Sequence, residues 1–408
     1  MTAALKSELA IFNQPLTQVT MEKAFWSDIH PTHNIKNCKQ IEFNITASDL
    51  YYYDLNDSLL STRIKAIKPT GHVAADIHWF ENMPGSSMIK TISVYLNDVP
   101  IEGTHDLYAY KADISSKLQY NTNIQKCQLA AAGYEETLAT RQSWTADTVT
   151  REFISPLFLD IFCQSKYIIP KVNIKIVLTL AEDKFWTQIG PNCTHPWEFS
   201  IEEAILFVRK VQVCPSVKEA HELGLKKRNA IYPIRKTDLF YQTIPTGSKS
   251  FRHENIFREQ NPKMLIVAMV ANDAFIGHYK KDPFEFKPFG LSYMHLTKDG
   301  EAIPHSRPFS PSSTYVREYM SMLQAMEFFN KNVSNSISLD EFKTTKCIFV
   351  FNLCPDMDMS VGQPRKKGNL RLDLQFTTAL TEAVNVIFFG IWDSVMEIDY
   401  ARKVHMIP

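Results

Sequence analysis

The histidines are the first residues to test for metal chemistry. His30 and His33 stand three residues apart with Pro31 between them, and no cluster of cysteines or carboxylates lies beside them. A cupin, the commonest jelly-roll enzyme, surrounds its metal with an H-x-H on one strand and a further histidine and glutamate behind it. The sequence contains no H-x-H. We therefore expect His30 and His33 to lie in a solvated loop, and His253 and His278, which occur singly, to be structural or surface residues.

The cysteines favour reduced thiols. Their number is odd and no two form a C-x-x-C pair, which argues against a disulfide framework and against a zinc site. Cys163 and Cys214 each follow an apolar strand pattern, so we expect buried, inert thiols rather than nucleophiles. The seven cysteines are at positions 38, 127, 163, 193, 214, 347 and 354.

Signatures of phosphate or nucleic-acid binding are weak. The "GSKS" at 247–250 lacks the G-x-x-x-x-G-K spacing of a phosphate loop, and the short basic runs at 225–230 and 364–369 are typical of solvated turns. Lys plus Arg and Asp plus Glu are equal at 44 each, which disfavours a protein that neutralises many phosphates. We predict no catalytic, cofactor-binding or metal-binding residues, no enzyme activity, no cofactor and no specific nucleic-acid partner.

The elements that would position any site are mostly strands. At the C-terminal end, Leu370, Leu372, Leu374 and Phe376 alternate with polar residues, and residues 384–399 are β-branched and aromatic almost throughout. Such patterns predict two long strands. We expect Leu372 and Leu374 to point into a sandwich core.

These two strands have counterparts earlier in the chain. Six segments of strand-like sequence recur in the same order at offsets near 200 residues, which indicates one β domain written twice. The paired segments begin at 39 and 238, 60 and 262, 92 and 292, 152 and 346, 171 and 368, and 202 and 384.

Few helical patterns interrupt the strands. One lies at 107–118 and its counterpart at 314–329, both inside long connections, and a third lies between the halves, with Ser216 and Glu219 spaced as a capping box. A doubly wound fold would need a helix after nearly every strand. We predict an all-β fold of two tandem, separately cored jelly-roll sandwiches, joined by a short linker helix and carrying long helix-containing loops. The expected boundaries are an N-terminal arm at 1–35, a first jelly roll at 36–214, a linker helix at 215–230 and a second jelly roll at 231–408.

Composition limits the cellular setting. The 408 residues suit two domains. The N-terminus shows no basic-then-apolar secretory pattern, and the longest apolar runs, about nine residues, are too short to span a bilayer. We expect a soluble protein that is intracellular where it is made and has no membrane span. Zero formal net charge is compatible with self-association.

Several long stretches resemble one protein family. The chain resembles the double jelly-roll major capsid proteins of Polinton (Maverick) elements and adintoviruses and, more distantly, the adenovirus hexon. The resemblance is densest after residue 200 and is weaker between 103 and 150. The stretches that carry it are 12–26, 206–217, 230–236, 262–289, 315–322, 366–376 and 384–399.

The resemblance implies a structural role. It implies a homotrimer of pseudo-hexagonal outline that tiles an icosahedral shell, with the last two strands facing the core on one side and solvent on the other. Further partners would be minor capsid and penton proteins. The location would be the virion, with synthesis in the host cytoplasm and assembly in the nucleus or cytoplasm. The long connections at 103–150 and 304–345 would form towers that clasp neighbouring subunits. Two alternatives stay open: a carbohydrate-binding or hydrolytic tandem β-sandwich, and a domesticated host copy of the capsid protein.

Overall fold

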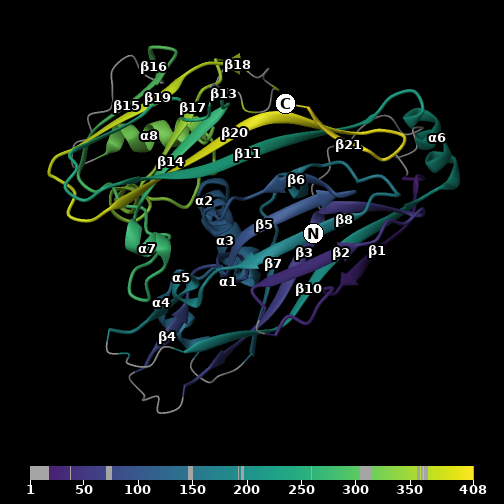
Figure 1. Cartoon of the computed structure of the whole chain (residues 1–408), viewed down its shortest axis with the longest axis horizontal. Coiled ribbons are helices and arrows are strands. Elements are labelled where there is room, and N and C mark those ends of the chain that lie inside the picture. Colours follow the sequence, from purple (N-terminus) through teal and green to yellow (C-terminus); the bar gives the residue numbers. More distant parts are fainter. Residues whose placement is uncertain are drawn as a thin grey trace, which may run out of the picture.

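The chain forms two β-sandwiches that lie side by side (Figure 1). The computed structural model describes residues 18–36, 38–69, 76–145, 150–191, 193, 197–258, 260–303, 315–355, 359, 362 and 366–407. All pairings between its named strands are antiparallel.

The first sandwich contains two four-stranded sheets. One has the order β1 (Met21–Ile29), β10 (Glu198–Val213), β3 (Tyr51–Ile67) and β7 (Thr150–Pro156). The other has the order β2 (Gln40–Ile45), β8 (Ile174–Leu180), β5 (Ile89–Leu96) and β6 (Val99–Gly103). A small additional ribbon pairs β4 (His78–Phe80) with β9 (Thr187–Ile189).

The second sandwich repeats this order. One sheet runs β11 (Ala230–Ile244), β20 (Val384–Ile398), β14 (Met264–Ala271) and β17 (Ile348–Asn352), with β21 (Val404–Ile407) added to β20. The other runs β12 (Ser250–His253), β19 (Leu370–Phe376), β15 (Leu291–Lys298) and β16 (Glu301–Ile303). A short ribbon pairs β13 (Gln260–Asn261) with β18 (Lys366–Lys367). Eight strands in two sheets, in the same order twice, make this an all-β fold of two jelly rolls.

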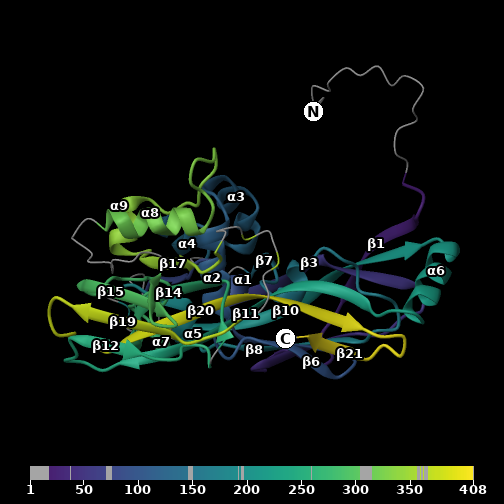
Figure 2. The same cartoon turned by 90° about the horizontal axis from the view of Figure 1, so that it is seen from above.

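The helices lie in the connections. Figure 2 shows α3, α8 and α9 on the same side of the sheets, whereas α6 lies at the end of the molecule, where the chain passes from one sandwich to the other. The helical segments are α1 (Pro84–Ser87), α2 (Tyr108–Gln119), α3 (Thr122–Cys127), η1 (Leu129–Ala132), α4 (Leu138–Ser143), η2 (Asp160–Cys163), α5 (Asp183–Trp186), α6 (Pro215–Leu225), α7 (Asn272–Ile276), α8 (Val316–Ala325) and α9 (Leu339–Thr344).

Five of the six repeat pairs join strands that occupy equivalent places in the two sandwiches: β3 with β14, β5–β6 with β15–β16, β7 with β17, β8 with β19, and β10 with β20. The pair at 39 and 238 is wrong. Residue 39 precedes β2, whose counterpart is β12, whereas residue 238 lies in β11, the counterpart of β1. Alternation alone produced this match, because any two exposed-edge strands share a period of two.

The ends of the first jelly roll differ from the expectation. Met21–Ile29, which we assigned to the arm, form β1 and pair with β10 as an edge strand of the first sandwich. The described part of this sandwich therefore begins well before residue 36. Residues 1–17 lie outside the described part of the chain.

The cap of the linker helix is also not the expected one. Helix α6 begins at Pro215, Cys214 is the N-cap residue, and no side chain caps the helix. Proline has a fixed φ suited to the first helical position, so the N-cap residue is Cys214, two residues before the expected Ser216. Ser216 lies inside the first turn, and its capping box with Glu219 does not form.

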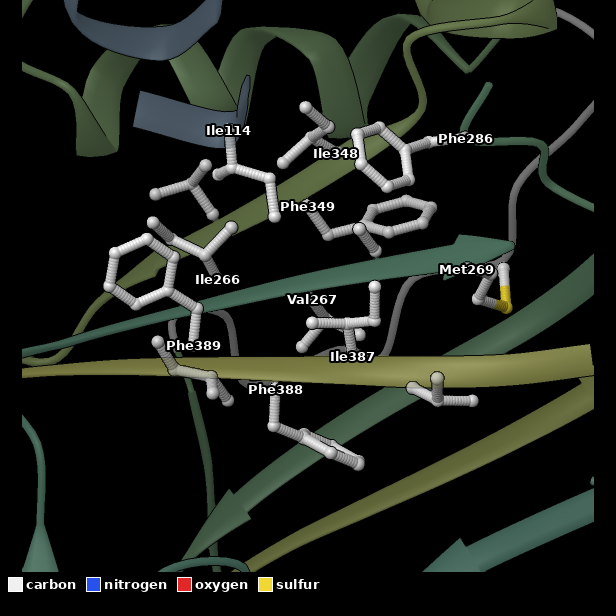
Figure 3. Packing of buried hydrophobic residues seen from close by; sticks show 14 of the residues in the cluster. Ile114, Ile266, Val267, Met269, Phe286, Ile348, Phe349, Ile387, Phe388 and Phe389 are labelled. Atoms are coloured by element: carbon white, nitrogen blue, oxygen red, sulfur yellow. The ribbon is translucent and has the colours of Figure 1, made fainter. Parts of the chain in front are cut away.

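The last two strands, β19 and β20, differ in which of their residues are buried. In β19, Leu372 and Leu374 are almost fully buried while Gln375 is exposed, as the alternation predicts. In β20, by contrast, every residue from Val384 to Trp392 is buried, so the expected solvent-facing side is wrong for this strand. Figure 3 shows Phe388 and Phe389 pointing to opposite sides of β20. Both of its faces are therefore covered by protein.

Helix α2 of the first half packs against the second sandwich. Although α2 follows β6 of the first sandwich, its Tyr110, Ile114 and Leu118 belong to the core of the second sandwich. Figure 3 shows Ile114 beside Ile348 of β17. The same helix adds Tyr108 to the first core. The described residues thus form one core cluster for each sandwich, as predicted, but α2 contributes to both clusters, which the sequence did not indicate.

Candidate functional site

The residues singled out for metal chemistry do not meet. His30 and His33 are exposed in the loop after β1, and His278 is exposed in the turn after α7. His253 is half-buried among Phe240, Phe251 and Phe388. Among the described residues, no group of three His, Cys, Asp or Glu side chains could hold a metal ion.

The cysteines are free thiols in the structure, but two of them are less buried than expected. Cys163 is exposed and Cys214 is half-buried, because each lies where an element ends rather than inside a strand. Desolvation by the surrounding protein nevertheless raises the pKa of the Cys163 thiol to about 11. The thiol is therefore protonated at neutral pH and is a poor nucleophile.

The first basic run lies on the surface. Lys226, Lys227 and Arg228 are exposed at the C-terminal end of α6, where cations are favourable near the negative end of the helix dipole. Lys366 and Lys367 form β18. Residues 364 and 365 of the second run lie outside the described part of the chain.

A large pocket lies between the two sandwiches. Its volume is about 1090 Å³. The first half contributes α2, η2 and the segment before η2, and the second half contributes β11, β14 and β20. Most of its wall is apolar, for example Leu118, Phe158 and Ile266, while Lys111 and Asp160 form a polar part of the wall. Sequence reasoning missed this pocket because its walls come from segments far apart in the chain.

The polar wall belongs to a buried ionic cluster. Lys111 Nζ of α2 lies 2.6 Å from Glu102 Oε1 and 2.7 Å from Asp160 Oδ1. All three side chains are less than one-tenth exposed. The backbone N–H of Asp160 donates to Glu102 Oε2 at 2.7 Å. We call Glu102, Lys111 and Asp160 the junction triad.

The junction triad reaches across to the second half. Thr237 of β11 donates its backbone N–H to Asp160 Oδ2 at 2.7 Å and its hydroxyl to Asp160 Oδ1 at 2.8 Å. Asp160 thus satisfies a backbone donor of β11 that would otherwise need a partner. Hydrogen bonds to ionised groups are the stronger class, so the triad fixes the position of β11 against η2.

A second ionic contact holds the other end of α2. Lys117 Nζ is 2.7 Å from Asp113 Oδ2 and donates to the backbone oxygen of Phe284 at 2.8 Å. The Lys117 ammonium also lies 5.0 Å from the ring centre of Phe286. Phe284 and Phe286 belong to the second half. Helix α2 therefore contacts the second half directly through Lys117, and indirectly through Asp160, which bridges Lys111 and Thr237.

Burial makes ionisation of these carboxyl groups less favourable. Desolvation raises the pKa of Glu102 to about 7, and Asp160 adds to this effect while Lys111 opposes it. Desolvation likewise raises the pKa of Asp113 to about 6 against the opposing charge of Lys117. Each of these two carboxyl groups lies within hydrogen-bonding distance of a lysine ammonium. The arrangement positions structural elements, and nothing in its geometry assigns it a reaction.

The only sequence signal for these contacts was the composition of 107–118. Its three charged residues, Lys111, Asp113 and Lys117, are usual on a solvated helix. In the structure, 11 of the 12 residues of α2 (Tyr108–Gln119) are buried. The partners that make this possible lie at positions 102, 160 and 284, which no local pattern connects.

Comparison with known proteins supports the fold over its full length. No protein-family model matches the chain. Among proteins of known structure, a chain of the Sputnik virophage is 12% identical with a TM-score of 0.69, covering 100% of this chain and 93% of that one. The mavirus major capsid protein is 11% identical with a TM-score of 0.58, covering 100% and 95%. The Faustovirus major capsid protein is 9% identical with a TM-score of 0.61, covering 95% and 92%.

Similarity to these proteins agrees with the duplicated strand order. The chain has a double jelly-roll fold. In sequence, an uncharacterized protein of Caenorhabditis elegans is 21% identical over 95% of this chain and 98% of its own length. Within the described residues, no helix is both long and apolar enough to cross a membrane.

Proposed function

We propose that this protein is a major capsid protein of the Polinton, Maverick and adintovirus type. Its subunits would form homotrimers of pseudo-hexagonal outline, and these trimers would tile an icosahedral shell. The proposal includes contacts with minor capsid and penton proteins and a place in the virion. It includes no cofactor and no catalysis.

The observation that carries the proposal is the fold match over nearly the whole of both chains. Proteins such as the mavirus and Faustovirus major capsid proteins contain both jelly rolls in one subunit, as this chain does. Six sandwiches around one three-fold axis close on themselves, so assembly stops at three subunits. That symmetry gives a reason for a duplicated sandwich in one chain.

The edge strand β1 offers a surface for such contacts. Val19, Met21 and Trp26 are 71%, 37% and 50% exposed, and β1 pairs only with β10 among the described strands. The free edge of a strand invites pairing with another chain, and tryptophan is enriched in the cores of protein interfaces. We propose that a neighbouring subunit covers β1.

Oligomeric mass is the direct test. The subunit mass is 46.9 kDa, so light scattering on the purified protein should return about 141 kDa at micromolar concentration and keep that value on dilution. Negative-stain images should show particles with a hexagonal outline. A stable monomer at every concentration and salt would overturn the capsid proposal.

Variants at Trp26 test whether β1 forms the contact between subunits, independently of whether a trimer forms. We expect Trp26→Glu to shift the mass toward the monomer, because a charge in an apolar contact is costly, and Trp26→Phe to retain the trimer. A trimer that survives Trp26→Glu would place the contact elsewhere and leave the capsid proposal standing.

A domesticated host copy is the second candidate, and the nematode relative is the observation that favours it. A chain of similar length in Caenorhabditis elegans raises the prospect that such genes persist in animal genomes. Adjacent genes for a packaging ATPase, a maturation protease and a polymerase would support the viral or transposon-borne reading. Their absence, with trimers that never form shells, would support domestication.

A further inference from the structure

The contact between the two sandwiches contains an unbalanced set of charges. The junction triad has two carboxylates and one ammonium, and its three side chains are nearly enclosed by protein. When both carboxylates are ionised, the triad holds a net charge of about −1 away from water. Burying uncompensated charge is costly, whereas one bound proton would make the triad neutral.

The neighbouring groups do not cancel this charge. On α2, the Tyr108 hydroxyl is neutral, since burial raises its pKa to about 12. On η2, Cys163 is a protonated thiol. Thr237 of β11 supplies hydrogen bonds without a formal charge. Arg235 of β11 is near Cys163, but it is exposed and donates to the backbone oxygen of Met359, so solvent screens its charge from the triad. Arg235 is the only other cation of this pocket wall among the described lining residues.

We propose that the junction triad is a pH-sensitive lock between the two sandwiches. With one proton bound, the triad is neutral and α2, η2 and β11 pack tightly. Loss of that proton leaves a buried negative charge, which weakens the packing of α2 between the sandwiches. The lock is a property of the single subunit and does not depend on the capsid role.

The direction of the effect follows from linkage. The pKa of Glu102 is raised from 4.5 to about 7 in the folded protein. A group whose pKa is raised by folding contributes stability that is fully present below the unfolded value and is lost as pH rises through the folded value. Through this group the junction is therefore tightest at acidic pH and loosens as pH rises toward about 7, where the loss is nearly complete.

Amide hydrogen exchange of the peptide 108–119 measures this opening directly. The full-length protein would be compared at about pH 6 and about pH 8.5, with each rate divided by the intrinsic rate at that pH. A site with a pKa about one unit above the lower pH changes the opening equilibrium about tenfold. The protection factor at about pH 6 divided by that at about pH 8.5 should thus be about ten times larger in the wild type than in Glu102→Gln.

Two further variants complete the experiment. Glu203→Gln removes an exposed glutamate of β10 that pairs with Arg63, and it should keep the wild-type ratio. Asp160→Asn removes the other buried carboxylate and should flatten the pH dependence as Glu102→Gln does, which covers the case that Glu102→Gln does not fold. Protection that is independent of pH in the wild type, or that rises with pH, would overturn the proposal. A wild-type ratio retained in both Glu102→Gln and Asp160→Asn would overturn it as well.

Discussion

Truncation of Ile114 tests whether α2 of the first half stabilises the core of the second sandwich. Ile114 is fully buried in α2 and packs against the second sandwich. Ile114→Ala removes three carbon atoms, worth about 0.8 kcal/mol each in transfer free energy. The cavity that is left adds to this loss. We expect the free energy of unfolding to fall by roughly 3–4 kcal/mol.

The loss should appear on both sides of the junction. Urea denaturation gives the overall change, and amide hydrogen exchange should show weaker protection in β14 and β17 as well as in β5 and β8. Gln119→Ala, at the exposed end of the same helix, should change stability by no more than about 0.5 kcal/mol. If β14 and β17 keep their protection in folded Ile114→Ala, α2 does not stabilise the second sandwich and its assignment to that core is refuted.

Three smaller changes test other parts of the fold. Leu372→Ala should lower the free energy of unfolding in urea by about 2–5 kcal/mol. Gln375→Ala, on the exposed side of β19, should lower it by less than about 0.5 kcal/mol. Similar losses for the two variants would mean that both faces of the strand are buried. Ser338 caps α9 in a capping box, so Ser338→Ala should cost about 1 kcal/mol in thermal unfolding, while Ser216→Ala should cost clearly less. The pKa of Asp113 is raised from 3.8 to about 6, so its contribution to stability is lost as pH rises through about 6; Asp113→Asn should make denaturation midpoints less dependent on pH over that range, and an unchanged slope would contradict the assignment.

Most strands could be predicted because the pattern of buried residues in each strand is visible within one short segment of sequence. In β19 one face meets the core and the other meets solvent, so the period of two in Leu370–Phe376 is visible in the sequence. Strand β14, buried throughout most of its length, was visible as an uninterrupted apolar run. The internal repeat of the sandwich was detected from strands with such clear patterns. Strand β1 was missed as a strand of the sandwich because most of its residues are exposed, which removes the alternation.

The role of α2 was not predictable from its own residues. A helix with Lys111, Asp113 and Lys117 is read as solvated, since buried charges are rare without partners. Each of these charges has a partner, and those partners come from β6, η2 and the segment at 284. Sequence patterns describe the periodicity of one element. They do not report which distant groups will neutralise its charges.

The same helix explains why two sandwiches with equal strand order have unequal strands. Strand β10 has intermediate residues along one side, whereas its counterpart β20 is buried on both sides from Val384 to Trp392. The difference lies outside the strands: in the second sandwich, α2 from the first half and Met322 and Ala325 of α8 join the core that contains β14, β17 and β20. A sheet covered on both faces selects apolar residues at every position. The apolar sequence of β20 therefore reflects a core that is completed by α8 of the same half and by α2 of the other half.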